Sequence, residues 1–168
     1  GVATPAKVIS KRGPMPIDSF IQVININLIG TMNIIRLAAE QMLKNTPNED
    51  GEKGVVINTA SDAAFEGQIG QAAYSASKAG VVGMTLPIAR EFADYGIRNA
   101  TIAPGLFDTP MIAGMTDQVR ASLIATCLFP KRMGKASEYA SLAKEIIENV
   151  MINGATFRLD GALRLQPT

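Results

Sequence analysis

The chain has 168 residues, which is the length of one domain or of a large part of one. Its 47% apolar and 18% charged residues are typical of a globular protein with a substantial core, and its net charge of +1 gives no reason to expect nucleic acid or an anionic membrane as the main partner. Histidine is absent from the sequence, which excludes a Ser-His-Asp triad, a histidine base and every histidine-bearing metal site.

The single cysteine, Cys127, permits neither an internal disulfide nor a cysteine zinc cluster, which fits a reducing compartment and a chain without a metal. The apolar stretches are interrupted by Asn, Gly, Arg or Glu, so we expect no signal peptide and no membrane-spanning helix. These features together predict an intracellular protein.

The first part of the chain is predicted to form one long helix. Gly1-Val2-Ala3 has the composition of a strand exit, and residues 4–16, with three prolines and a glycine, predict a loop. From about Ile17 to Lys44, apolar residues recur at helical spacing. Two asparagines and a glycine in the middle of this helix, within residues 25–30, lower its helix propensity. They are either polar residues on the outer face of a packed helix or a functional feature centred on Asn27.

A strand and a second helix carry the candidate chemistry. After a polar loop, the run Val55–Ala60 is rich in β-branched residues and ends in small polar ones, as a buried strand does where it reaches a cleft. Ser61 follows it directly. After a loop with two glycines, Tyr74 and Lys78 lie four residues apart in a segment predicted to be helical, so both side chains share one face. A hydroxyl, a phenol and an ammonium group in this order suggest an acid–base device.

Such a device is physically reasonable near neutral pH. A free phenol keeps its proton until about pH 10. A lysine ammonium group about 5 Å away, at an effective dielectric of about 20, favours the phenolate by roughly 3 kcal/mol. Tyr74 could then exchange a proton with an alcohol or a ketone, while Ser61 donates a hydrogen bond to the substrate oxygen. The alternative is an ordinary helix pair, because Y-x-x-x-K is a common pattern; the preceding Ser61 favours the catalytic interpretation.

The second helix is predicted to continue to about Tyr95 and to end at Gly96, which is typical of a helix C-terminus. It is apolar almost all round, which predicts burial on more than one side, and Pro87 predicts a mild kink. Ile97–Ala103 is the next predicted strand. The turn Pro104–Pro110 lies at its carboxyl end, where ligands bind in parallel α/β sheets.

The last third of the chain is less clearly patterned. Residues 111–133 are rich in Met and Ala and predict either a mobile lid over the substrate or a plain surface helix. Lys131 and Arg132 either meet a substrate phosphate or are simply solvated. An amphipathic helix is predicted over residues 136–150, and a last strand over Thr156–Leu159.

These motifs resemble those of the short-chain dehydrogenase/reductase family. The matching residues are the strand-end Ser61, the Y-x-x-x-K of Tyr74 and Lys78, and the N-L-x-G of Asn27, and the resemblance extends over the whole chain. NTAS-DAAFEGQ-GQAAYSASK, followed by MTLPIAR and TIAPGLFDTP, is most similar to the type-2 3-hydroxyacyl-CoA dehydrogenase group, which also oxidises hydroxysteroids and short branched hydroxyacyl-CoAs.

The resemblance implies a role for each matched residue. Tyr74 is the acid/base, Lys78 favours the phenolate and touches the cofactor ribose, Ser61 orients the substrate oxygen, and Asn27 binds a water molecule in a proton relay. The turn after the second strand is expected to border the cofactor, and the loop before Tyr74 to contact substrate or to be solvated. These additional candidates are Pro104, Gly105, Phe107 and Thr109 for the cofactor, and Gln68 and Gln71 for the substrate.

The resemblance also implies the cofactor and the partners. It favours NAD over NADP, a short 3-hydroxyacyl-CoA or steroid-like substrate, and a homodimer or homotetramer built on the two long helices. The compartment would be the cytoplasm in a bacterium and the mitochondrial matrix in a eukaryote. The glycine-rich dinucleotide turn of the family and the acidic residue that selects NAD have no counterpart in this sequence, so the preference for NAD rests on the resemblance alone.

The sequence therefore predicts a doubly wound α/β fold of the Rossmann type with a parallel sheet. Residues 1–168 are expected to form the C-terminal, catalytic and substrate-binding portion of a single short-chain dehydrogenase domain, with the N-terminal dinucleotide-binding half missing. The expected reaction is the reversible oxidation of a secondary alcohol to a ketone. Two alternatives stay open. One is another short-chain reductase that acts on acyl-carrier-protein, steroid or sugar substrates. The other is a non-catalytic truncated scaffold, in which the strand Val55–Ala60 would be an open sheet edge.

Overall fold

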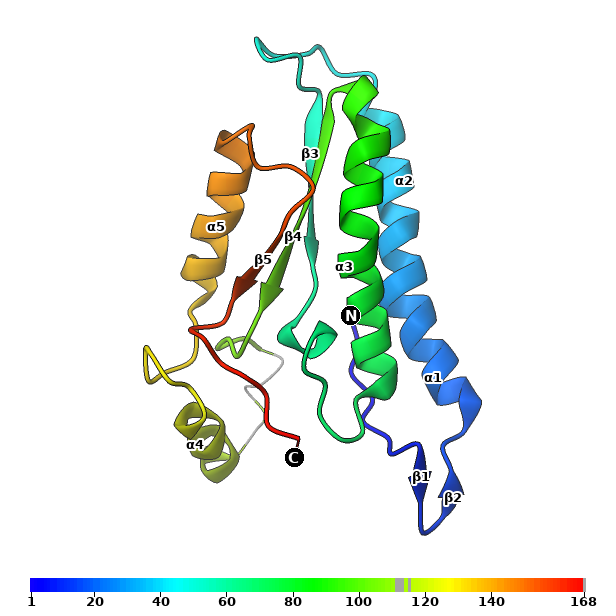
Figure 1. Cartoon of the computed structure of the whole chain (residues 1–168), viewed down its shortest axis with the longest axis vertical. Coiled ribbons are helices and arrows are strands. Elements are labelled where there is room, and N and C mark those ends of the chain that lie inside the picture. Colours follow the sequence, from blue (N-terminus) through cyan, green and yellow to red (C-terminus); the bar gives the residue numbers. More distant parts are fainter. Residues whose placement is uncertain (111–113, 115, 168) are drawn as a thin grey trace.

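The computed structural model describes residues 1–110, 114 and 116–167, and a parallel three-stranded sheet lies at its centre. The strands are β3 (Gly54–Thr59), β4 (Ile97–Pro104) and β5 (Thr156–Leu159), in the spatial order β3-β4-β5. Helices cover both faces of this sheet, α2 (Gly30–Met42) and α3 (Ala72–Phe92) on one side and α5 (Ala136–Glu148) on the other (Figure 1). The predicted doubly wound parallel architecture is therefore confirmed, and the predicted strands match the observed ones to within one residue.

Each face of the sheet carries its own apolar core, because alternate residues of β4 point in opposite directions. Ala103 packs with Ala60 and with Val81 of α3 on one face. Ala100 and Ile102 pack with Ile146 of α5 on the other. The two layers hold the carboxyl ends of β3 and β4 in place between the helices.

The long first helix is interrupted by a wider turn. It comprises α1 (Ile17–Ile24), a π-helical turn η1 (Asn25–Ile29) and α2 (Gly30–Met42). The amide of Gly30 donates to the carbonyl of Asn25, five residues back, which is the π-helical pattern. The stretch with weak helix propensity is thus the place where the helix deviates from α geometry.

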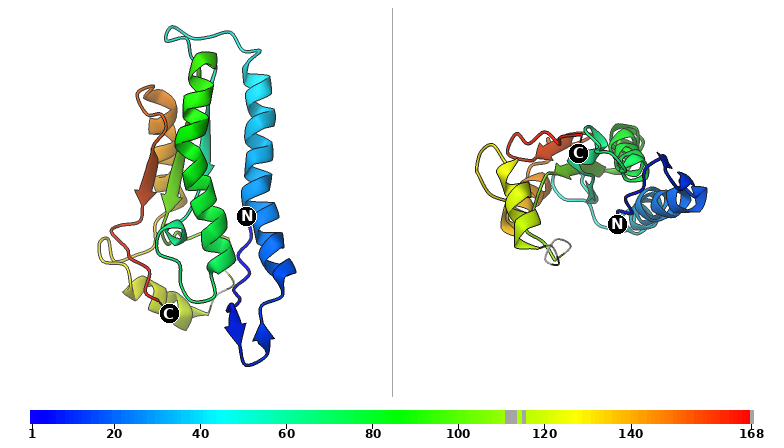
Figure 2. Two further views of the ribbon diagram at one scale, coloured as in Figure 1. Left: turned by 45° about the vertical axis from the view of Figure 1, so that its right-hand side comes forward. Right: turned by 90° about the horizontal axis from the view of Figure 1, so that it is seen from below.

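The second long helix, α3 (Ala72–Phe92), runs alongside the first (Figure 2). A Cβ atom added at Gly80 would lie 2.8 Å from both terminal carbons of Leu28, so the missing side chain allows the π-helical turn to approach α3 closely. A 3-10 turn, η3 (Ala93–Tyr95), follows α3, and Gly96 then ends the helix with a φ of 67°, as predicted.

Buried polar side chains fix α3 against the sheet. The amide of Asn58 on β3 donates to Oδ1 of Asn99 on β4 at 2.8 Å, and Nδ2 of Asn99 donates to the carbonyl of Thr85 on α3 at 2.9 Å. The hydroxyls of Thr85 and Thr101 are 2.6 Å apart. A buried network with its partners satisfied favours one arrangement of helix and strands, and this arrangement places the first turns of α3 beside the end of β3.

Three local predictions need correction or completion. The predicted loop over residues 4–16 contains a short hairpin, β1 (Ile9–Ser10) and β2 (Gly13–Pro14), in which Gly13 adopts a φ of 101°. A 3-10 turn, η2 (Asp62–Ala64), follows β3. In the predicted lid segment, residues 111–113 and 115 lie outside the described residues; the helix α4 (Asp117–Ala125) forms in the rest, and movement of the segment stays a prediction.

The strand β3 lies at an edge of the sheet and pairs only with β4 among the described residues. Much of the apolar surface of α1 and α2 is also exposed in this chain. By length and composition alone, Ile17–Met42 would be long enough and apolar enough to cross a membrane. The core helix of a globular protein passes the same test, so the expectation of no membrane-spanning helix stays a prediction.

Candidate active site

Ser61 lies two residues after the end of β3 and is the N-cap of the η2 turn, in extended backbone geometry. Its Oγ accepts a hydrogen bond from the amide of Ala63 at 3.2 Å, which is the side-chain cap of that turn. Since the oxygen acts as an acceptor here, the hydroxyl hydrogen is left to donate to another group. The local turn therefore orients Ser61 as a hydrogen-bond donor.

Tyr74 and Lys78 lie one helical turn apart near the start of α3, as predicted, and both side chains are half-buried. The Lys78 Nζ is 5.8 Å from the centre of the Tyr74 ring. It donates a hydrogen bond to the carbonyl of Thr59, the last residue of β3, at 2.8 Å. Burial lowers the pKa of Lys78 below its usual value, because desolvation disfavours the ammonium form.

These three side chains share one cleft of about 580 Å³ at the carboxyl ends of β3 and β4. A volume of this size is typical of small-molecule and cofactor sites. The four candidates from the turn after β4 also line it. The lining residues predicted from sequence are Ser61, Tyr74, Lys78, Pro104, Gly105, Phe107 and Thr109.

Contacts outside its own turn hold Phe107 in the cleft wall. A Cβ atom at Gly134 would lie 2.7 Å from the Phe107 ring, so the ring occupies the space that a side chain would take. The amide of Gly134 donates to the carbonyl of Leu106 at 2.8 Å. The ring of Tyr139, on α5, meets Phe107 edge to face, with 6.4 Å between the ring centres.

Asn27 is buried in the π-helical turn and lies beside the cleft. Its Nδ2 and Oδ1 form two hydrogen bonds of 2.8 Å with the backbone of Val2, and Nδ2 also lies 3.1 Å from the hydroxyl of Ser77. The side chain thus fixes the first residues of the chain, which line the cleft, to the helix pair. A part for Asn27 in a proton relay stays a prediction.

Gln68 and Gln71 are not among the described residues that line the cleft. The amide of Gln68 donates to the side-chain oxygen of Gln71 at 3.0 Å, and Nε2 of Gln68 donates to the carbonyl of Gln166 at 3.0 Å. These hydrogen bonds join the loop to the C-terminal segment, and substrate contact by either glutamine stays a prediction.

Sequence reasoning missed a hydroxyl pair in the cleft. The Oγ1 of Thr59 and the phenol oxygen of Tyr139 are 2.6 Å apart, although 80 residues separate them. Both side chains line the cleft. The polar end of β3 was a signal for Thr59, whereas Tyr139 follows the apolar periodicity of α5 and gave no local sign of its contact.

The cleft has groups suited to the nicotinamide-ribose end of a dinucleotide. Gly1 and Gly105 are among its lining residues, and the lining is mainly apolar. The Lys78 ammonium and the Thr109 hydroxyl can hydrogen-bond to ribose or phosphate oxygens. The residues present therefore fit this part of the cofactor.

A parallel sheet with helices on both faces, and a cleft that joins a strand-end serine to a tyrosine–lysine pair, define a short-chain dehydrogenase. The family model described as short chain dehydrogenase matches residues 8–120 of the chain, and the protein belongs to this family.

Several of the most similar relatives in this family share one name. The chain is 56% identical to the 3-hydroxyacyl-CoA dehydrogenase type-2 of Drosophila melanogaster, over 99% of this chain and 66% of the relative. It is 53% identical to the Homo sapiens protein of the same name, over 99% of this chain and 65% of the relative. The crystal structure of 3-hydroxyacyl-CoA dehydrogenase type-2 from Mycobacterium avium aligns with a TM-score of 0.96 at 41% identity, over 100% of this chain and 66% of that one. The chain thus spans slightly less than two thirds of their length.

Proposed function

We propose that the complete protein carrying this chain is an NAD(H)-dependent dehydrogenase that interconverts a secondary alcohol and a ketone, with a short 3-hydroxyacyl-CoA as its preferred substrate. The observation that carries the proposal is the convergence of Ser61, Tyr74 and Lys78 on one cleft. The names of the relatives at 53 to 58% identity support the choice of substrate.

In this proposal, each polar group of the cleft has one task. When bound, the dinucleotide supplies or accepts the hydride. The Ser61 hydroxyl donates to the substrate oxygen and holds the carbon beside the cofactor ring. The Tyr74 phenol gives a proton to the oxygen of a ketone, or takes one from an alcohol. The positive charge of Lys78, 5.8 Å from the centre of that ring, stabilises the phenolate.

The hydrogen bond from Lys78 to the Thr59 carbonyl supports this task in a second way. It ties the ammonium group to the end of β3, the same strand end that Ser61 follows. The donor and the proton-transfer group are thereby held on one rigid unit of strand and helix. Rigid placement of this kind lowers the cost of reaching the reactive geometry.

The proposal is tested with the complete protein and acetoacetyl-CoA, by following the loss of NADH absorbance with NADPH in parallel. We expect NADH-selective reduction. The Tyr74→Phe variant removes only the hydroxyl, and it should lower kcat by about 10²- to 10⁴-fold, the usual contribution of a positioned acid or base. Tyr95→Phe is the matched control, because Tyr95 is 55% exposed in the η3 turn and lies outside the cleft lining.

A Tyr74→Phe variant with the full rate would refute the assigned acid/base. Turnover of 3-oxoacyl-carrier-protein, steroid or sugar substrates in preference to acetoacetyl-CoA would keep the class of reaction and replace the substrate. Failure of a folded wild-type protein to oxidise or reduce any of them would favour the non-catalytic scaffold.

We also propose a homodimer or homotetramer built on the helices α1, α2 and α3, in the cytoplasm of a bacterium or the mitochondrial matrix of a eukaryote. Exposed apolar side chains on these helices and on the η1 turn between α1 and α2 support the pairing, among them Ile21, Ile29, Met32 and Leu86. Burial of such a surface between subunits is favourable. Analytical ultracentrifugation of the wild type and of Ile29→Asp tests it, and a monomeric wild type would refute it.

A further inference from the structure

The first residue of the η2 turn, Asp62, is a buried carboxyl group next to Ser61. It is 1% exposed, and neither of its side-chain oxygens has a hydrogen-bond partner among the described residues. Buried carboxylates are normally paired or hydrogen-bonded, since water no longer solvates their charge. A carboxyl group in this state, one residue from the proposed substrate-binding hydroxyl, calls for a physical explanation.

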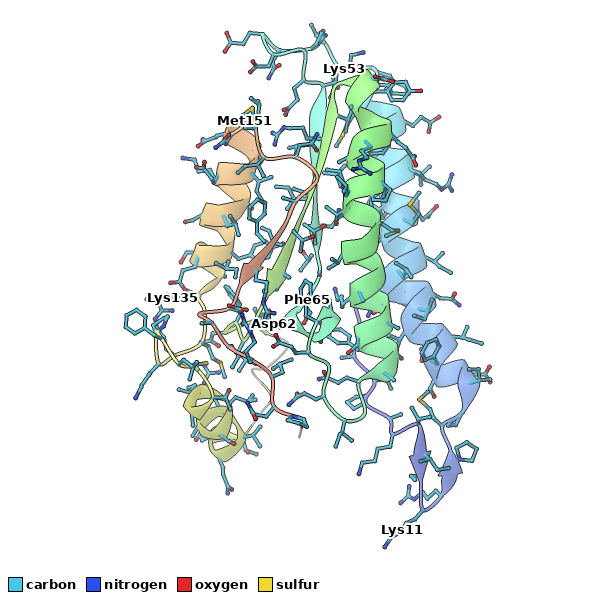
Figure 3. All side chains as sticks on the ribbon, in the orientation of Figure 1. Lys11, Lys53, Asp62, Phe65, Lys135 and Met151 are labelled. Carbon is cyan, nitrogen blue, oxygen red and sulfur yellow. The ribbon has the colours of Figure 1, made fainter. Side chains whose placement is uncertain are left out.

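The nearest cation is already bound to other acids. The closest Asp62 oxygen is 3.6 Å from the Arg158 guanidinium. That guanidinium donates to Glu66 at 2.8 Å and to Asp160 at 2.7 Å, and it also donates to the carbonyl of Leu163. The same guanidinium lies over the Phe65 ring, and Figure 3 labels Asp62 and Phe65 at the place where the η2 turn faces the segment after β5.

The charges of this cluster balance only if Asp62 carries a proton. The cluster has three carboxyl groups, from Asp62, Glu66 and Asp160, and two guanidinium groups, from Arg158 and Arg164. Glu66 and Asp160 each contact both arginines. An ionised Asp62 would add a third negative charge in the most buried position, where an unpaired charge is most costly.

The carboxyl group also supports the wall of the cleft. A Cβ atom at Gly105 would lie 2.8 Å from Oδ2 of Asp62 and 2.9 Å from Cβ of Asp160, so the side chain of Asp62 packs directly behind this cleft residue. On its other side, the η2 turn that Asp62 begins supplies the Ala63 amide that binds Ser61 Oγ. Any movement of Asp62 is therefore transmitted to Ser61 and to Gly105.

We propose that Asp62 is a positioning residue for Ser61, and that its protonated form holds the η2 turn in the arrangement that lets Ser61 bind the substrate oxygen. This inference rests on the proposed function of Ser61. Ionisation of Asp62 places a negative charge behind Gly105. This charge either attracts the Arg158 guanidinium away from its other partners or attracts water into the turn, and in both cases Ser61 shifts. Ketone binding and reduction then weaken as the pH rises through neutrality.

The electrostatic surroundings agree with this assignment. Burial, followed by the charge of Asp160, raises the pKa of Asp62 to about 7; Glu66 raises it further, and Arg158 and Arg164 oppose the rise. The helix α3 also packs against the turn and contributes Tyr74 and Lys78 on the cleft side, while β4 ends there in the uncharged pair 104–105. Among the described residues, the charged groups that face Asp62 from its own turn, from β5 and from the C-terminal segment are those of Glu66, Arg158, Asp160 and Arg164.

The test compares pH profiles of kcat/KM for acetoacetyl-CoA reduction by the complete protein, from pH 5.5 to 9. Asp62→Asn has nearly the same shape and cannot ionise. We expect the ratio of the variant's kcat/KM to that of the wild type to rise by at least about threefold between pH 6 and pH 8.5, because only the wild type loses the productive form. Asp50→Asn, in an exposed loop, is the control and should give a constant ratio.

A second measurement does not depend on turnover. In protein labelled with ¹³C at aspartate carboxyl carbons, the resonance that disappears in Asp62→Asn, or in Asp62→Val if the amide variant does not fold, belongs to Asp62. We expect this resonance in the wild type to titrate with a midpoint near neutrality. A midpoint below pH 5 overturns the proposal, and so does a constant kcat/KM ratio for Asp62→Asn in a protein whose Tyr74→Phe variant is inactive. Full activity of Tyr74→Phe would instead count against the proposed function.

Discussion

The strongest prediction for stability concerns Arg98, which is 6% exposed on β4. Its guanidinium forms an ion pair with Glu52, at 2.5 Å, and donates to four carbonyl groups around the end of α5, those of Ile146, Ile147, Asn149 and Ile152. The last carbonyls of a helix have no partner within it. One side chain therefore closes α5 and joins it to the sheet and to the loop before β3.

We expect Arg98→Met to destabilise the complete protein by about 3 to 5 kcal/mol. Removing one partner of a buried ion pair leaves the other charge uncompensated, which usually costs about this much. The helix carbonyls lose their donor at the same time. Because Glu52 keeps 15% of its side-chain surface in contact with solvent, the lower end of the range is the better expectation. For a protein of this size, a loss of about 3 kcal/mol lowers Tm by roughly 6 to 12 °C.

Urea unfolding followed by circular dichroism measures this loss, with Arg90→Met on the exposed face of α3 as the control for removal of an arginine. The double variant Glu52→Gln/Arg98→Met separates the ion pair from the helix carbonyls, because it removes the uncompensated acid and leaves the carbonyls unpaired. An Arg98→Met protein within 1 kcal/mol of the wild type would show that water replaces all of these contacts, and the reasoning would be wrong.

Two further predictions concern residues in and behind the wall of the proposed active-site cleft. Burial raises the pKa of Asp62 from 3.8 to about 7, so the contribution of this group to stability is complete below pH 4 and is lost as the pH rises through 7. The Tm of Asp62→Asn should therefore rise relative to the Tm of the wild type over this pH range. A constant difference between the two Tm values would contradict the prediction. In Gly134→Ala the added Cβ would lie 2.7 Å from the Phe107 ring and must displace it, so KM for NADH should increase several-fold; Gly83→Ala, where the added atom meets nothing within 4 Å, should leave KM unchanged.

The elements of the fold were predictable because their signals are local. A β-branched run bounded by turn residues predicts β3, a long Ala-rich apolar segment predicts α3, and apolar spacing predicts α5. The π-helical turn at Asn25–Ile29 was predictable only as a weak stretch of helix, since its geometry depends on the approach of α3 at Gly80. The hairpin of β1 and β2 pairs only two residues on each side, which is too short for a clear alternation.

The candidate site was predictable to the extent that it lies in one continuous segment. Ser61, Tyr74 and Lys78 fall within 18 residues, and the geometry of one strand end and one helix face brings them together. For the two glutamines in the same segment, the partners, each other and the backbone of Gln166, could not be read from their position, and substrate contact by either stays a prediction.

The parts of the cleft that sequence reasoning missed depend on contacts over long distances in the chain. Tyr139 reaches Thr59 across 80 residues, and Arg158 reaches the Asp62 turn from β5. A local motif can thus place the groups proposed to transfer the proton, while distant segments contribute to the cleft wall and to the contacts of the turn beside Ser61. Substitutions near Arg158 or Gly134 should accordingly change binding and pH dependence without any change in the proton-transfer residues themselves. This separation is the physical reason why the reaction class can be inferred from one segment, whereas the substrate must be measured.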